Sequence, residues 1–133
     1  MLAETDTKKL EKVFSGYPEI EAVYLFGSAA TKKKKYIGDL DLGIVESAPS
    51  ILEKKIDLYA DLVKQGFDDV DLIFFNSVDL VLQFEIIHHN KLLYRKEGFE
   101  HSELFSKTIR KYFDFEPYLE RQREKLKERI LHG

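Results

Sequence analysis

The sequence predicts an α/β (α+β) domain in which a small mixed β-sheet is flanked by helices and followed by a helical tail. Short apolar segments with strand character alternate with segments of helical spacing, and the last quarter of the chain, from residue 99, has helical spacing. A chain of 133 residues is the size of one domain. We therefore expect a single domain over residues 1–133, with a core at about 1–97 and a tail at about 98–133.

The predicted strands differ in how they are buried. Residues 22–26 are apolar on both faces, whereas residues 39–45 alternate between polar and apolar side chains. Residues 69–75 form the third strand by the same alternation. Residues 91–96 are expected to be a short strand at the edge of the sheet.

Helical spacing covers most of the remaining chain. The first helix is expected to start from an N-cap among Thr5, Asp6 and Thr7 and to end near Phe14. Gly66 is a plausible C-cap for the second, and Pro117 suits the first turn of the last. The other helices are predicted at residues 51–64, 78–89, 99–113 and 117–131.

Composition narrows the function classes. The formal net charge is −3 and the sequence pI is near 5.8, so direct nucleic-acid binding is not expected. The chain has no Cys, which excludes disulfides and thiolate metal sites. No apolar run approaches the length of a membrane span, and residues 1–6 lack the layout of a signal peptide. A cytoplasmic protein without a membrane segment is the expectation.

Asp39 and Asp41 carry the strongest chemical signal. On a strand they point to the same side, about 6.5 Å apart, and Gly43 follows on that side and leaves space. Neighbouring carboxylates repel each other, and a bound divalent cation favours both ionised forms. Hard oxygen ligands of this kind suit Mg²⁺ or Mn²⁺.

Asp71 supplies a third carboxylate. It shares a face with Asp69 and Ile73, and it joins Asp39 and Asp41 if the third strand lies beside the second. Three carboxylates can hold two metal ions about 3.5–4 Å apart, an arrangement that serves phosphoryl displacement.

Gly27 and Ser28 follow the first buried strand. Glycine lets the backbone approach a ligand closely, and Ser28 adds a hydroxyl and an amide, so the pair can hold the phosphates of a nucleotide. Each motif alone has an ordinary alternative. Asp39 and Asp41 can be a solvated strand end, Gly27 and Ser28 a plain turn, and Asp71 a surface residue whose role Asp68 or Asp69 could take instead. The compound pattern, with ten residues between Ser28 and Asp39, favours the catalytic interpretation.

With these motifs in place, the sequence resembles the minimal nucleotidyltransferases (MNT) of the DNA polymerase β superfamily. That signature is Gly-Ser, a spacer, Asp-x-Asp and a distal carboxylate, here Gly27-Ser28, Asp39-Leu40-Asp41 and Asp71. The tail is similar to that of longer MNT antitoxins, with Lys-Leu-Leu-Tyr at residues 91–94 before an Asp-x-x-Pro helix start at residues 114–117.

The resemblance implies a polymerase β-like nucleotidyltransferase fold and a function. Members of this group neutralise a HEPN-domain ribonuclease toxin by transferring AMP from ATP to a toxin tyrosine. It implies two Mg²⁺ ions on Asp39, Asp41 and Asp71, which are also the catalytic residues, and phosphate binding by Gly27 and Ser28. The alternatives are a stoichiometric toxin-binding protein with a vestigial nucleotide site, and a nucleotidyltransferase that acts on a small molecule.

The chain departs from the family pattern at three positions. Thr31 and Lys32 stand where many relatives have Arg-Gly, and Gly38 stands where they have Ser before the first Asp. The lysines at residues 32–35 are either point charges that replace the missing Arg or a solvated loop. Nucleotide preference, acceptor residues and oligomeric state stay open.

The remaining motifs have simpler explanations. His88 and His89 lie next to each other on a helix and point in different directions, so a metal site there is not expected. The aromatic residues of the tail are interpreted as helix-packing residues, with a partner surface as the alternative. Its alternating acidic and basic residues are interpreted as a solvated helix face.

Overall fold

The computed structural model describes residues 3–27 and 40–132 and contains a four-stranded mixed sheet. The strand order is β3-β2-β1-β4. Strand β1 pairs antiparallel with both β2 and β4, whereas β2 pairs parallel with β3. The strands are β1 (Ile20–Phe26), β2 (Leu40–Glu46), β3 (Val70–Phe74) and β4 (Leu92–Arg95). The predicted mixed sheet and the edge position of its last strand are confirmed.

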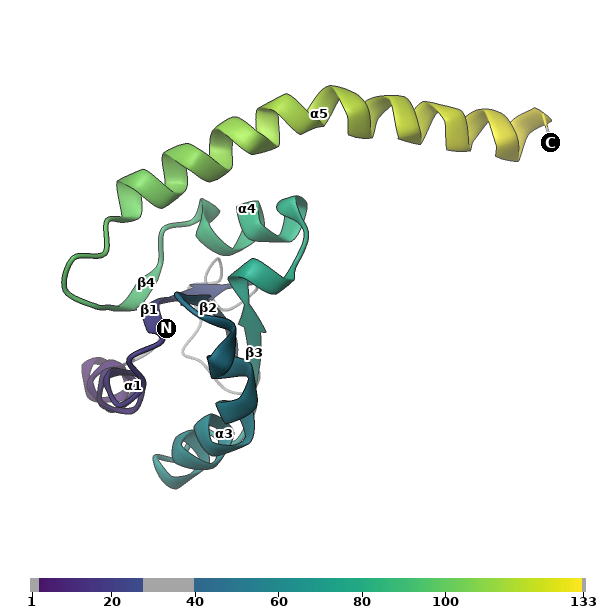
Figure 1. The fold of residues 1–133 in the computed structure, drawn as a ribbon. Coiled ribbons are helices and arrows are strands. Elements are labelled where there is room, and N and C mark those ends of the chain that lie inside the picture. Colours follow the sequence, from purple (N-terminus) through teal and green to yellow (C-terminus); the bar gives the residue numbers. More distant parts are fainter. Residues whose placement is uncertain (1–2, 28–39, 133) are drawn as a thin grey trace.

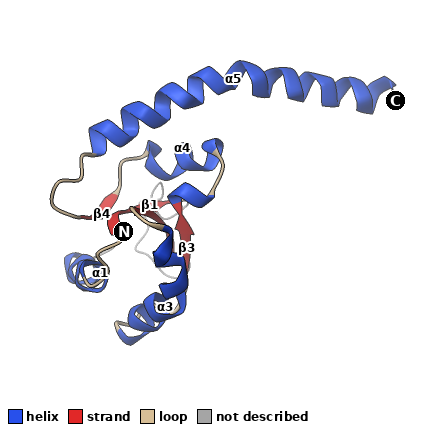
Figure 2. Ribbon diagram, in the orientation of Figure 1, coloured by secondary structure: helices blue, strands red, loops and turns tan. Residues whose placement is uncertain are grey.

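Helices cover both faces of the sheet. Helices α1 and α3 lie on one side in Figure 1, whereas α4 and α5 lie on the other. Figure 2 shows the strands enclosed between these helices. The helices are α1 (Glu4–Ser15), α3 (Lys55–Lys64), α4 (Leu80–His88) and α5 (His101–His132), with short 3₁₀ turns at Pro49–Lys54 (η1) and Phe75–Ser77 (η2). None of the helices in the described ranges is long and apolar enough to cross a membrane.

Alternation along the strands produces one core on each face. Leu40, Leu42 and Ile44 point into the core beneath α1 and α3, where Leu10, Phe14 and their neighbours are fully buried. The other face carries Tyr24, Val45 and Phe75 against Ile86 and Ile87 of α4. Because β1 beyond Glu21 and β2 from Leu42 to Val45 are buried on both faces, each strand can lie in the middle of a covered sheet.

Two predicted helix starts are wrong. Helix α1 begins at Glu4 with Ala3 as its N-cap and has no side-chain cap, so Thr5 and Asp6 lie inside the first turn. There Asp6 still has a favourable position, since acidic groups near a helix N-terminus interact well with its free amides. The segment predicted from residue 51 starts earlier, as the 3₁₀ turn at Pro49, because proline favours the first position of a helix.

Gly66 ends α3 in the predicted way. Its φ of 95° is a left-handed conformation that glycine adopts without a side-chain penalty. The amide of Gly66 donates to the carbonyl of Val63, and the amide of Phe67 donates to the carbonyl of Leu62. These two bonds form a Schellman motif, which directs the chain into β3.

The tail is one helix and not two. Residues 99–113 and 117–131 were predicted as separate helices with Pro117 as a start, but α5 runs through Pro117 without a break. Figure 1 shows that it curves along its length. Pro117 removes one backbone donor, and the carbonyl that loses it belongs to the exposed Phe113, where water can replace the bond. Strong helix formers after Pro117 keep the helix continuous.

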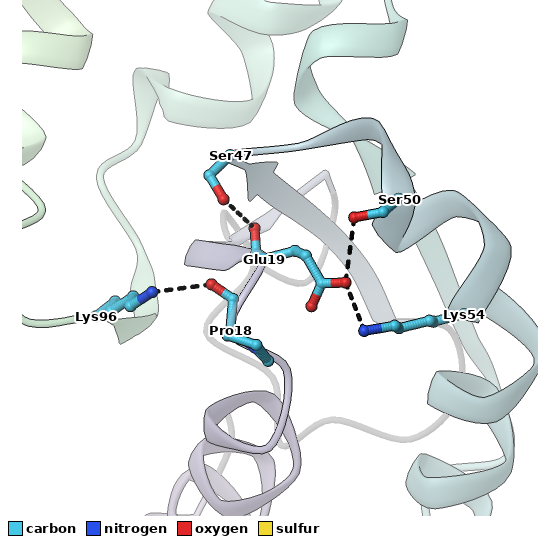
Figure 3. Close-up of polar contacts among 6 residues, drawn as sticks. All are labelled: Pro18, Glu19, Ser47, Ser50, Lys54 and Lys96. Atoms are coloured by element: carbon cyan, nitrogen blue, oxygen red, sulfur yellow. Dashed lines mark hydrogen bonds and ion pairs between the residues drawn. The ribbon is translucent and has the colours of Figure 1, made fainter.

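A polar cluster fixes the start of β1 (Figure 3). The Oε2 of Glu19 lies 2.6 Å from Nζ of Lys54 and accepts a hydrogen bond from Ser50, while the Glu19 carbonyl accepts one from Ser47. The Lys54 ammonium holds the pKa of the Glu19 carboxyl below its ordinary value. Lys96 donates to the Pro18 carbonyl from the other side. The cluster therefore ties β1 to η1 and to the end of β4.

Gly43 does not leave space for a ligand, contrary to the prediction. Helix α4 passes directly over it, and a Cβ on Gly43 would overlap Cγ2 of Ile86. It would also lie 3.3 Å from Cβ of Ile86, so a rotamer change alone would not clear the contact. Glycine is required here because α4 and β2 approach closely.

We expect Gly43→Ala to lower the free energy of unfolding by about 1–3 kcal/mol, because it overpacks the α4 interface. In an Ile86→Ala background the same substitution should cost little, since the overlapping atoms are gone. Urea unfolding of the four proteins measures the coupling. Gly16→Ala is the control, since Gly16 has an ordinary φ of −76° and only one backbone oxygen at 3.3 Å. Equal costs of Gly43→Ala in both backgrounds would contradict the packing explanation.

Candidate active site

Asp41 and Asp71 lie side by side on the sheet. The parallel pairing of β2 with β3 places Asp41 opposite Asp71, with Leu42 opposite Leu72 as the next pair. Neighbouring strands are about 4.8 Å apart, and register partners point to the same face. The sequence expectation that Asp71 lies beside Asp41 is thus met.

The two carboxylates lie on the α4 side of the sheet. Val45 shares the face of Asp41 and Gly43 on β2, and Ile73 shares the face of Asp71 on β3; both belong to the core beneath α4 and α5. Asp41 is half-buried and Asp71 is exposed. Each is the second residue of its strand, so both are at the end of the sheet where β1 finishes. The residues further along both strands are mostly apolar and buried, so the polar side chains lie at this end of the sheet.

Gly27 borders Asp41 directly. It follows β1, whose last residue Phe26 is the register partner of Asp41. Gly27 has a φ of 73°, and a Cβ added to it would lie 2.5 Å from Oδ2 of Asp41. The missing side chain therefore leaves room for the carboxylate, and the left-handed turn favours glycine at this position.

Two of the predicted site residues cannot be compared with the structure. Ser28 and Asp39 lie outside the described residues, as do Thr31, Gly38 and the lysines at residues 32–35. The structure brings together three of the five predicted residues: Gly27, Asp41 and Asp71.

The carboxylates of Asp41 and Asp71 suit a hard cation. Asp41 and Asp71 offer carboxylate oxygens from adjacent strands, the ligands that Mg²⁺ and Mn²⁺ prefer. Within residues 3–27 and 40–132 no group of three or more His, Cys, Asp or Glu side chains is arranged to hold a metal ion. The third predicted ligand, Asp39, falls outside those ranges.

The opposite end of β2 is fixed by a pair that the sequence analysis missed. Glu46 is 7% exposed, and its Oε1 accepts hydrogen bonds from the backbone amide of Asn76 at 2.9 Å and from its Nδ2 at 2.8 Å. The same Nδ2 donates to the Glu46 carbonyl. These bonds join β2 to η2, directly after β3, and help to hold the register that pairs Asp41 with Asp71. The position of Glu46 at the end of an apolar strand is the sequence feature that could have indicated a buried, hydrogen-bonded carboxylate.

A second missed pair joins α5 to the sheet. The hydroxyl of the buried Tyr24 lies 2.5 Å from Nδ1 of His101. Burial raises the pKa of the Tyr24 hydroxyl and lowers the pKa of His101, which favours the neutral form of both groups. The ring of His88 stacks on Phe84 with 5.0 Å between the centroids.

Comparison with known proteins identifies a family model for most of the chain. The polymerase β nucleotidyltransferase model matches residues 8–98. No curated protein sequence matches the chain.

Solved structures match over nearly the whole length. A chain of a toxin–antitoxin complex with AMP-PNP is 21% identical, with a TM-score of 0.70, and the match covers 94% of this chain and 98% of that one. A chain of the tri-AMPylated HEPN toxin in complex with MNT antitoxin, from Shewanella oneidensis, is also 21% identical, with a TM-score of 0.69 and coverage of 96% and 98%. At this identity the likeness establishes the fold, and it extends through the helical tail.

We expect Gly27→Ala to destabilise the protein for two separable reasons. The left-handed backbone should cost about 1–2 kcal/mol by itself, and displacement of the Asp41 carboxylate should add to it. Gly66→Ala is a matched control, because Gly66 also has a positive φ but a Cβ there would meet nothing within 4 Å.

Urea unfolding should therefore show a larger loss for Gly27→Ala than for Gly66→Ala. In an Asp41→Ala background the two losses should become similar, since only the backbone cost is left. A Gly27→Ala loss that is no larger than that of Gly66→Ala in the wild-type background would show that Gly27 does not make room for Asp41.

Proposed function

This chain belongs to the polymerase β nucleotidyltransferase family, and we propose that it transfers AMP from ATP to a tyrosine of a HEPN-domain ribonuclease toxin, acting as the antitoxin of that pair. The observation that carries the proposal is the pairing of Asp41 with Asp71 next to Gly27. Adjacent carboxylates beside an open turn suit a metal-bound triphosphate. They suit a purely structural role poorly, because like charges repel across a sheet.

Each residue has a proposed role. Asp39, Asp41 and Asp71 would hold two Mg²⁺ ions, and the turn at Gly27 and Ser28 would hold the β- and γ-phosphates. When bound, the ions neutralise the charge of the triphosphate and make the attacking hydroxyl more acidic. The half-buried Asp41, fixed between β1 and β3, would set the position of the α-phosphate, and the exposed Asp71 would face the incoming acceptor.

The proposed step exchanges one phosphorus–oxygen bond for another. The tyrosine oxygen forms a bond to the α-phosphorus, and the bond from that phosphorus to the bridging oxygen of the β-phosphate breaks. Pyrophosphate leaves with the electron pair of the broken bond. The tyrosine proton passes to a carboxylate, for which Asp71 is the proposed acceptor, and from there to water.

Two further observations support this choice of substrate and partner. One structural relative was solved with AMP-PNP, and another as a tri-AMPylated HEPN toxin with its MNT antitoxin. The likeness to these chains includes the tail as well as the catalytic core. We place this reaction in the cytoplasm, which is where ATP and the RNA substrates of a ribonuclease are found and which suits a chain without Cys.

We expect Asp41→Asn and Asp71→Asn each to reduce AMP transfer on the order of 100-fold or more, because each removes charge that acts in the transition state. Asp71→Asn should leave the melting temperature unchanged or raised, since it relieves repulsion from Asp41. The assay incubates this protein with its toxin partner, ATP and Mg²⁺, and follows the added AMP by intact-protein mass spectrometry.

Asp68→Asn is the matched control, because Asp68 is exposed and lies just before β3. It should leave transfer unchanged. Wild-type rates in both Asp41→Asn and Asp71→Asn would refute the proposed site. Toxin inhibition without any mass increase, even when ATP is omitted, would replace enzymatic transfer with stoichiometric binding.

A further inference from the structure

Helix α5 uses one stripe of side chains to pack on the domain. His101, Phe105, Thr108 and Tyr112 follow a spacing of four and three residues, which keeps them on one face. His101 contacts Tyr24, Thr108 is 3% exposed, and Tyr112 stacks on Phe84 of α4 with 4.4 Å between the ring centroids. This half of α5 is therefore partnered by α4 and the sheet.

The second half of α5 continues the stripe without a partner in the described chain. It extends past α4 and away from the rest of the domain (Figure 1). The same spacing leads to Phe115, Gln122 and Leu126. Phe115 is 37% exposed and Leu126 is 57% exposed. From Phe115 to Arg129 the helix presents about 20 Å of this surface, enough for about four turns of a second helix.

Charges border the stripe in an ordered way. At 100° per residue, Arg123 and Lys127 lie along one side of it, and Lys125 and Arg129 lie along the other. Between Glu120 and Arg129 the acidic residues Glu120, Glu124 and Glu128 fall on the opposite face of the helix. Arg123 lies 3.5 Å from Glu120 at the margin between the two faces. From Glu120 onward the expected alternation of charge thus separates into basic residues on both sides of a largely apolar stripe and acidic residues on the opposite face.

We propose that the stripe from Phe115 to Arg129 binds an amphipathic helix of another protein whose own apolar stripe is bordered by acidic side chains. The acidic rows would face the basic rows of α5, as the flanking positions of two-stranded coiled coils do. A second copy of this chain is disfavoured, because its basic rows would meet those of the first. The inference goes beyond the transfer reaction and holds whichever reaction the site performs.

The test uses the full-length chain and two designed peptides. Each labelled peptide has three heptads with Leu at positions a and d; one has Glu at e and g, and the other has Lys there. Fluorescence anisotropy should show binding of the Glu peptide and at least tenfold weaker binding of the Lys peptide. Added salt should weaken the Glu complex, because the flanking pairs are exposed. No ATP or metal is needed, so failure here is distinguishable from failure of the proposed transfer.

Stripe and control variants sharpen the result. Phe115→Ser combined with Leu126→Ser should weaken binding of the Glu peptide at least tenfold. Phe113→Ser is the matched control, because Phe113 is 57% exposed, as Leu126 is, but lies on the acidic side of the helix. It should bind as the wild type does. Circular dichroism confirms that each variant keeps the helix.

Several outcomes would overturn the proposal. Equal affinity for the Glu and Lys peptides, or equal loss in the stripe and control variants, would remove the stripe as the docking surface. A concentration-dependent dimer in sedimentation that Leu126→Ser abolishes would assign the stripe to a second copy of this chain. Binding to phosphatidylglycerol vesicles but not to the Glu peptide would assign it to an anionic membrane surface.

Discussion

The parallel pairing of β2 with β3 is the constraint on which the site depends. It sets Asp41 opposite Asp71, and the antiparallel pairing of β1 with β2 brings Gly27 to the same end of the sheet. A shift of one residue would move Asp71 to the opposite face, because side chains alternate along a strand. Leu72 and Phe74, buried beneath α1 and α3, prevent that shift, since they would become the residues facing α4.

Contacts elsewhere in the fold keep Asp41 and Asp71 close together although their carboxylates repel each other. Glu46 and Asn76 fix the far end of β2 to the turn after β3, and Glu19 and Lys54 fix the start of β1. Ile86 presses α4 onto Gly43, two residues from Asp41. The polar site is therefore built on strands whose positions are determined by packing on both faces, which is what a precise ligand geometry requires.

Sequence reasoning was most successful where periodicity decides the structure. Alternation predicted the strands, and it placed Asp71 on the face of Ile73 and away from Leu72, as the structure has it. It was weaker where tertiary packing decides. Gly43 was expected to leave space, but the position of α4 above it depends on contacts distant in the sequence. The expected break at Pro117 is absent, because the lost hydrogen bond lies on an exposed part of a strongly helical segment.

The most direct test of the account is whether a divalent cation binds where Asp41 and Asp71 meet. Mn²⁺ is a suitable probe, because it takes the same oxygen ligands as Mg²⁺ and broadens the NMR signals of nearby amides. Titrated into the ¹⁵N-labelled protein, it should first broaden the amides of Gly27, Asp41 and Asp71, and Asp71→Asn should require a much higher Mn²⁺ concentration for the same effect. Broadening that begins at His88 and His89, or that is unchanged in Asp71→Asn, would contradict the account.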